Sequence, residues 1–378
     1  MMRRRKIRER GTVVDLFCGC GGFSLGAELA GFRSLVAIDI DPTLQSAYRR
    51  NFPRTRAVQA NVVEMEAADW HHFIGKTRPD GVIGGPPCQG FSRIGKSRKN
   101  DPRNNLLSHF FRHVSILRPK FFVMENVEGL LDDGKVDFLH SEIEGLPSRY
   151  RVLDPIIISA ANYGAPTYRR RVVIVGYDPA EVDEITDADI TRTKGRLVTV
   201  RDAIADLPGP IPESRDKGEF GWVKYPPRRE DRIPEYARLM RRPPPVNLGW
   251  SQAIELHNKG YVSGLTATNH TTEVARRYSV IGGGKSDPIT KAYRLEWDGQ
   301  CPTIRAGTGP DKGAFQAVRP LHPGKGRVIT VREGARLQGF PDWFVFHPTK
   351  WHSFRMIGNS VSPFVSHGLL ERIGGKIA

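Results

Sequence analysis

The chain has 378 residues, a hydrophobic content of 39% and a formal net charge of +16 at pH 7. Its length exceeds the usual size of a single hydrophobic core, so two domains are expected. No apolar run reaches the roughly 18 residues of a membrane span, so no membrane association is expected, and the positive charge favours a polyanionic partner such as nucleic acid.

The basic residues 1–10 are not followed by an apolar stretch, which argues against a secretory signal. We therefore expect a reducing cytosol and free thiols. The spacing of the cysteines matches no zinc-ligand pattern, so no metal site is expected. The four cysteines are Cys18, Cys20, Cys88 and Cys301.

Strand-like and helix-like segments alternate from residue 12 to residue 176. Continuous apolar runs between helical stretches predict a parallel sheet covered on both faces. The expected fold is therefore α/β, with a Rossmann-like, doubly wound and mostly parallel sheet. The strand-like runs are 12–17, 35–38, 81–83, 121–124 and 171–175, and residues 23–30 are expected to form a helix ending at Gly31.

Polar residues follow several of these runs, at the edge where parallel sheets bind ligands. Gly19, Gly21 and Gly22 stand between a strand and a helix, where they allow a tight turn and close approach of a ligand. Asp39 ends the next strand, where its carboxylate could accept both ribose hydroxyls. The pattern departs from the dinucleotide fingerprint. This departure favours a nucleoside cofactor without a pyrophosphate. A tight turn without a ligand is the alternative.

The stretch Gly84-Gly-Pro-Pro-Cys-Gln-Gly-Phe-Ser92 places Cys88 in a loop directly after a strand. Its two prolines restrict the path of the backbone, so the loop presents a thiol in a fixed place. Such a thiol can act as a nucleophile, although a small buried apolar residue is the alternative. The basic segment 93–103 follows and is expected to close over a phosphate backbone; a solvated loop is its alternative.

Beyond residue 180, strand-like and helix-like segments no longer alternate, because prolines recur from Pro208 to Pro245. We predict a first domain at 1–180, a second, smaller and irregular domain at 181–327, and a segment at 328–378 that returns to the first domain. Disordered insertions are the alternative for the second domain. The aromatic residues expected to build its small core are Trp222, Trp250, Tyr261, Tyr278, Tyr293 and Trp297.

Six motifs resemble, in order, those of the cytosine-C5 DNA methyltransferases. They are Phe17-x-Gly-x-Gly-Gly22, Gly84 to Ser92, Glu125-Asn-Val127, Arg169-x-Arg171, Arg336-Leu-Gln-Gly-Phe-Pro341 and Gly358-Asn-Ser-Val361. The resemblance covers roughly residues 12–177 and 327–363. It implies methyl transfer from S-adenosyl-L-methionine to C5 of a cytosine flipped out of double-stranded DNA, with residues 181–327 as the target-recognition domain.

The resemblance also implies site residues. The cofactor contacts are Phe17, Gly19, Cys20, Gly21, Gly22, Asp39, Ile40, Asn61, Val62, Pro87, Leu106, Asn359 and Val361, and the DNA contacts are Gln89, Ser92, Arg93, Lys96, Arg98 and Lys99. Three residues depart from the family pattern: Asp39 replaces a glutamate, Asn61 replaces an aspartate, and Thr167 replaces a glutamine.

The catalytic residues implied are Cys88, Glu125, Arg169 and Arg171. A thiolate of Cys88 adding to C6 would make C5 nucleophilic enough to take the methyl group. Glu125 would hold or protonate N3 of the cytosine. Arg171 would hold its O2, and Arg169 a phosphate or Glu125 itself.

Three other functions explain the sequence less well. A tRNA cytosine methyltransferase would share the catalytic motifs, but the large second domain disfavours it. A non-catalytic DNA-binding protein would not need Cys88, Glu125 and Arg171 together, and an oxidoreductase would not need the cysteine loop. The expected setting is the prokaryotic cytoplasm, in association with the nucleoid. The sequence leaves open whether a restriction endonuclease acts on the same site; no stable protein partner is required.

Overall fold

The computed structural model describes residues 4, 6–87, 105–192, 195–213, 216, 218–227, 229–306 and 319–377. In these residues, an eight-stranded sheet has the order β3-β2-β1-β4-β5-β8-β6, with β7 also paired to β8. The strands are β1 (Gly11–Leu16), β2 (Phe32–Asp39), β3 (Arg56–Gln59), β4 (Gly81–Gly84), β5 (Phe121–Asn126), β6 (Arg151–Val152), β7 (Ile156–Ser159) and β8 (Arg170–Tyr177).

The strands β1 to β5 are parallel, as expected, but β8 runs antiparallel to β5. The prediction of a parallel strand at 171–175 was therefore wrong in direction. An apolar strand buried on both faces has the same pattern in either direction, so its periodicity could not decide this. The antiparallel direction brings the start of β8 to the edge where β5 ends, with Glu125 opposite Val173 and Ile158 of β7 opposite Arg171.

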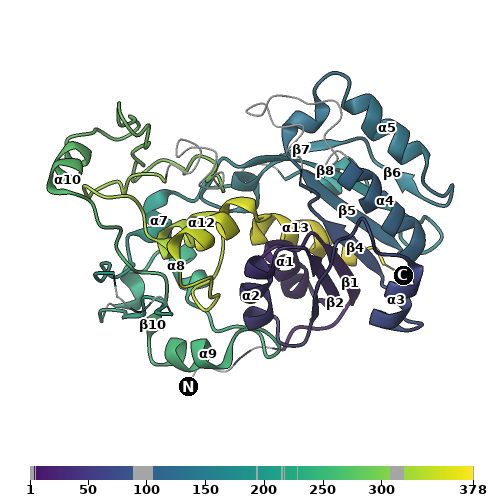
Figure 1. Cartoon of the computed structure of the whole chain (residues 1–378), viewed down its shortest axis with the longest axis horizontal. Helices are drawn as coiled ribbons and strands as arrows, with labels where there is room; N and C mark the ends of the chain where they lie inside the picture. Colours follow the sequence, from purple (N-terminus) through teal and green to yellow (C-terminus); the bar gives the residue numbers. More distant parts are fainter. Residues whose placement is uncertain are drawn as a thin grey trace.

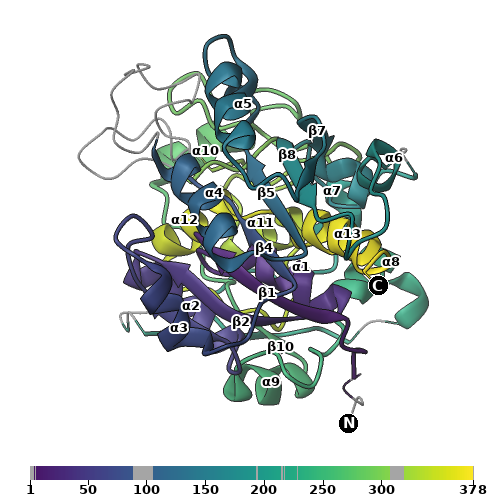
Figure 2. The same cartoon turned by 90° about the vertical axis from the view of Figure 1, so that its right-hand side faces the viewer.

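Successive side chains of the central strands point to opposite faces of the sheet. In β5, Phe121 and Val123 pack under α1 and α13, whereas Phe122 and Met124 pack against α3, α4 and α5. Helices therefore cover both faces, as the doubly wound prediction requires (Figures 1 and 2). The helices are α1 (Gly22–Ala30), α2 (Pro42–Asn51), α3 (Ala67–Ile74), α4 (Asn105–Leu117), α5 (Val136–Glu144) and α13 (Pro363–Gly374).

The end of the chain packs directly on its beginning. A Cβ added to Gly26 of α1 would lie 1.9 Å from Ser366 Oγ of α13, so only glycine allows this approach. Figure 1 shows the yellow C-terminal helices beside the purple α1. In the segment 328–378, α11 (Val331–Gln338) has Thr330 as its N-cap and Gly339 as its C-cap, and α12 (Lys350–Asn359) follows.

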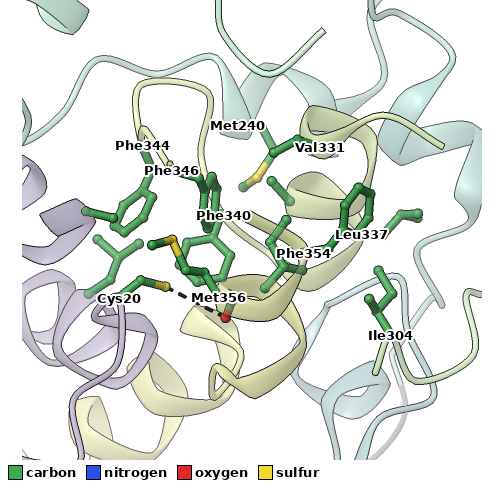
Figure 3. Close-up of a cluster of buried hydrophobic side chains, with 14 of the residues drawn as sticks. Cys20, Met240, Ile304, Val331, Leu337, Phe340, Phe344, Phe346, Phe354 and Met356 are labelled. Atoms are coloured by element: carbon green, nitrogen blue, oxygen red, sulfur yellow. Dashed lines mark hydrogen bonds between the residues drawn. The ribbon is translucent and has the colours of Figure 1, made fainter. Parts of the chain in front are cut away.

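The described residues between 181 and 327 form short elements joined by irregular segments. The six aromatic residues predicted to build a core here do not form one together, since of these six only Tyr278 is buried. Instead, Met240 and Ile304 share one core with Cys20 and with the C-terminal helices (Figure 3). The elements are α6 (Asp187–Ile190), α7 (Val200–Ile204), β9 (Val223–Lys224), α8 (Glu235–Met240), α9 (Ser251–Asn258), β10 (Tyr261–Val262) and α10 (Thr272–Ser279).

A buried ionic network joins this region to α11. The fully buried Arg336 guanidinium donates to Asp206 Oδ1 at 2.6 Å, to Asp342 Oδ1 at 2.8 Å and to the Tyr225 hydroxyl at 2.6 Å. Asp206 also accepts from Arg241 at 2.8 Å. Burial alone would raise the pKa of Asp342, but the Arg336 charge and its hydrogen bonds hold this pKa below its usual value. Each buried charge of this network therefore depends on its partners to offset the cost of its burial.

Across the described ranges, no helix has both the length and the apolar composition needed to cross a membrane.

We predict that Asp206→Ala destabilises the protein by about 3–5 kcal/mol, because it removes a buried carboxylate that pairs with both Arg241 and the fully buried Arg336. Chemical denaturation followed by circular dichroism measures this change. The control is Asp298→Ala, which removes a carboxylate from an exposed pair with Arg201 and should have little effect. Equal destabilisation by the two variants would contradict a structural role for the buried network.

Candidate functional site

The glycine loop between β1 and α1 has the backbone conformation that its sequence predicts. Gly19 and Gly21 have φ angles of 56° and 97°, and a Cβ on Gly21 would lie 2.3 Å from the Phe52 ring. Asp39 holds this loop, because its two carboxylate oxygens accept from Gly19 N and Asp41 N, each at 2.8 Å. Burial raises the pKa of Asp39, and these hydrogen bonds partly offset the increase.

The C-terminal segment reaches the same loop. Cys20 Sγ lies 3.1 Å from Ser360 Oγ, and a Cβ on Gly22 would lie 2.4 Å from Val361 O. The predicted cofactor residues from both ends of the chain are therefore neighbours. Asn359 is exposed beside them and Phe17, with a φ of 61°, is half-buried.

Sequence reasoning missed an ion pair that supports this arrangement. Arg355 of α12 contacts Asp41 at 2.5 Å, and Asp41 caps α2 by accepting from Thr43 N and Leu44 N. An aspartate directly before Pro42 is a recognisable N-cap signal. Arg355 carries no such local signal, because its partner lies at the other end of the chain.

A pocket of about 470 Å³ opens beside Asp39. Its lining includes two predicted residues, Ile40, which is 63% exposed, and Asn61. Val62 is buried behind the pocket, where its carbonyl accepts from Arg112 at 2.8 Å. The lining residues that sequence reasoning missed are Gln59, Ala60, Glu64, Met65 and Asp69.

A second group lies at the end of β5. Arg171 Nε is 2.9 Å from Glu125 Oε1, and a Cβ on Gly85 would lie 3.4 Å from Glu125 Oε2. Glu125 is thus paired with Arg171, whereas a phosphate or Glu125 was the partner expected for Arg169. Arg169 is buried, and its Nη1 donates to Gly358 O at 3.0 Å. Burial, followed by repulsion from Arg171, lowers the pKa of Arg169 to about 9.

The loop that leads to Cys88 is anchored at this edge. Asn126 Nδ2 donates to Pro86 O at 3.3 Å, and Pro87 is exposed. Leu106, near the start of α4, packs against the sheet. The predicted residues Cys88, Gln89, Ser92, Arg93, Lys96, Arg98 and Lys99 lie outside the described residues.

Thr167, which departs from the family pattern, has a structural contact. Its hydroxyl donates to Cys301 O at 2.9 Å, and Tyr168 N donates to the same carbonyl at 3.0 Å. These bonds fix the start of β8 against the segment at 301–306. In the part of the chain that the structure describes, no group of three or more His, Cys, Asp or Glu side chains is arranged to hold a metal ion.

Comparison with known proteins identifies the same family over nearly the whole chain. Residues 11–375 match the family described as C-5 cytosine-specific DNA methylase. The Type II methyltransferase M.XorII of Xanthomonas oryzae pv. oryzae is 40% identical over 96% of this chain and 84% of its own length. M.DdeI of Desulfomicrobium norvegicum is 30% identical over 96% of this chain and 88% of its own length.

Solved structures agree with this. An Escherichia coli chain described as a prophage-encoded candidate DNA modification methyltransferase has a TM-score of 0.85 and 38% identity, covering 97% of this chain and 99% of that chain. The Dnmt2 methyltransferase of S. pombe has a TM-score of 0.56 and 16% identity, covering 96% of this chain and 97% of that chain, which shows a shared fold.

We predict that Asp39→Asn weakens binding of the expected cofactor roughly tenfold to a hundredfold, because losing a hydrogen bond to a charged group costs about 1.5–3 kcal/mol. An amide can accept from only one of the two backbone N–H groups that Asp39 now holds. Isothermal titration with S-adenosylhomocysteine measures the change, and thermal unfolding without ligand checks that the fold is kept. Unchanged affinity in a folded variant would contradict this role of Asp39.

Proposed function

The chain belongs to the C-5 cytosine-specific DNA methylase family and is an S-adenosylmethionine-dependent DNA methyltransferase, and we propose that it acts through Cys88, with Glu125 and Arg171 contacting the cytosine. The observation that carries this proposal is the Glu125–Arg171 pair at the end of β5. It lies beside Gly85, in the loop that leads to Cys88, and Asn126 ties that loop to the same strand end.

The chemistry requires a nucleophile and a polarising group. Carbon 5 of cytosine is a poor nucleophile, and addition of the Cys88 thiolate to C6 turns it into an enamine-like carbon. Glu125 holds or protonates N3, which draws electron density from the ring. Arg171, positioned by Glu125, donates to O2. The buried Arg169 supports Gly358 rather than the substrate.

The residues around the glycine loop fit the cofactor. Gly19 has open space where a side chain would be, and Asp39 and the pocket at Ile40 and Asn61 lie beside it. S-adenosylmethionine supplies an electrophilic methyl group when bound. Asp39 orients the ribose, and Val361 closes the pocket from the C-terminal segment.

The substrate is double-stranded DNA, which suits the net charge of +16. A stacked base cannot reach the Glu125 edge, so the target cytosine is flipped out, at a cost of a few kcal/mol. Residues 181–327 form the target-recognition domain, and the basic segment 93–103 contacts the phosphates around the flipped base.

The relatives named as Type II methyltransferases support a role in restriction and modification. In that setting a restriction endonuclease recognises the same sequence, and methylation protects host DNA from it. The protein acts alone on its DNA, in the cytoplasm and at the nucleoid of a prokaryote.

We predict that Cys88→Ala abolishes methyl transfer while S-adenosylhomocysteine binding stays within about twofold of the parent protein, because the thiol is needed only for attack on C6. Transfer of a radiolabelled methyl group to duplex DNA measures activity. Glu125→Gln, which keeps the shape of the side chain, should retain a small residual rate. An active alanine variant would show that Cys88 is not the nucleophile.

We also predict that exchanging residues 181–327 for the corresponding region of a relative changes which cytosine is methylated. The reason is that the Glu125 edge and the glycine loop lie outside the exchanged segment. Sequencing of methylated cytosines identifies the target, and chimeras that melt cooperatively and bind S-adenosylhomocysteine are the ones compared. An unchanged target in an active chimera would contradict this assignment.

A further inference from the structure

The pocket beside Asp39 is lined by Glu64, a carboxylate that has no role in the proposed catalytic steps. Glu64 is exposed at the wall of this pocket, together with Asn61 and Ile40. In the proposed site the pocket takes the adenine of the cofactor, and the exocyclic amino group of adenine is a hydrogen-bond donor. The pocket must therefore offer an acceptor in a fixed place.

Asn61 is poorly suited to be that acceptor alone, because both ends of its amide already have partners. Its Nδ2 donates to Glu64 Oε1 at 2.8 Å, and its Oδ1 accepts from Val63 N at 3.1 Å. These two bonds fix the orientation of the amide, with the donor end turned to Glu64. The neutral carbonyl is left with only its second lone pair.

Arg112 holds the backbone on both sides of Glu64 in place. Arg112 of α4 donates to Val62 O at 2.8 Å, to Val63 O at 3.2 Å and to Met65 O at 2.8 Å. Glu64 N itself donates to Asn61 O at 3.0 Å, which closes the turn. A side chain on such a turn, oriented further by Asn61, is preorganised for a ligand.

The other polar side chains of the pocket have structural tasks. Asp69 Oδ2 accepts from Glu66 N at 2.8 Å and completes the capping box of α3. Gln59 donates to Ile40 O at 3.4 Å. Glu64 caps no helix; it is exposed, and its Oε1 accepts from Asn61, another residue of the pocket lining.

We propose that Glu64 accepts a hydrogen bond from the exocyclic amino group of the cofactor's adenine and thereby selects adenine over 6-oxo purines. Asn61 acts as a positioning residue that orients the Glu64 carboxylate. The negative charge that the family pattern places at position 61 stands at position 64 in this chain. This inference rests on the proposed cofactor site and goes beyond it.

The test compares binding of S-adenosylhomocysteine with binding of S-inosylhomocysteine, in which a carbonyl replaces the amino group. By isothermal titration, the parent protein should prefer the adenosyl compound by roughly five- to tenfold, the effect expected of one partly exposed hydrogen bond. Glu64→Gln should lose most of this preference, because a glutamine amide can donate to the carbonyl as well as accept. A preference that survives in Glu64→Gln would overturn the proposal.

Two further variants separate hydrogen bonding from general charge. Glu66→Gln removes the same charge from the same segment, outside the pocket lining, and should keep the preference. The double variant Asn61→Asp with Glu64→Gln moves the carboxylate to position 61 and should restore the preference. Loss of the preference in Glu66→Gln, or no restoration in the double variant, would overturn the assignment to Glu64.

The same titrations distinguish this inference from the proposed function. If the parent protein binds neither compound, the proposed cofactor site is wrong and the inference fails with it. If the parent binds both equally well, the cofactor site stands and only the role of Glu64 is wrong.

Discussion

The packing of α13 on α1 is the contact on which the functional site depends. The two helices can approach this closely only because Gly26 lacks a side chain where it meets Ser366, and Gly22 leaves room for Ser360 and Val361 of the segment before α13. The approach brings Ser360 and Val361 against the glycine loop, where Cys20 contacts Ser360. The segment before α13 therefore lies against the glycine loop of the proposed cofactor site.

The contact between Arg171 and Glu125 depends on the direction of β8. A parallel strand would have placed Arg169 and Arg171 at the opposite edge of the sheet from Glu125. The antiparallel strand instead gives the 2.9 Å contact between Arg171 and Glu125. The buried Arg336 network then joins Asp206 and Tyr225, which belong to the region proposed for DNA recognition, to α11.

Local signals explain which parts could be predicted from sequence. Gly31 and Gly339 end helices in the left-handed conformation that glycine favours, and Thr330 is a common N-cap, so these boundaries were accessible. The direction of β8 and the contact between Arg355 and Asp41 were not, because both depend on segments far apart in the chain. Glu64 was missed for another reason: its role depends on the turn that Arg112 holds.

In the proposed mechanism Cys88, which follows the loop beside the Glu125–Arg171 pair in the sequence, attacks C6 of a flipped cytosine. Duplex DNA containing 5-fluorocytosine tests it most directly, since the fluorine cannot leave as a proton does after methyl transfer. The account predicts a stable covalent complex that forms only with S-adenosylmethionine present and that peptide mass spectrometry maps to Cys88. An adduct at Cys18, Cys20 or Cys301, or an active enzyme that forms no adduct, would contradict it.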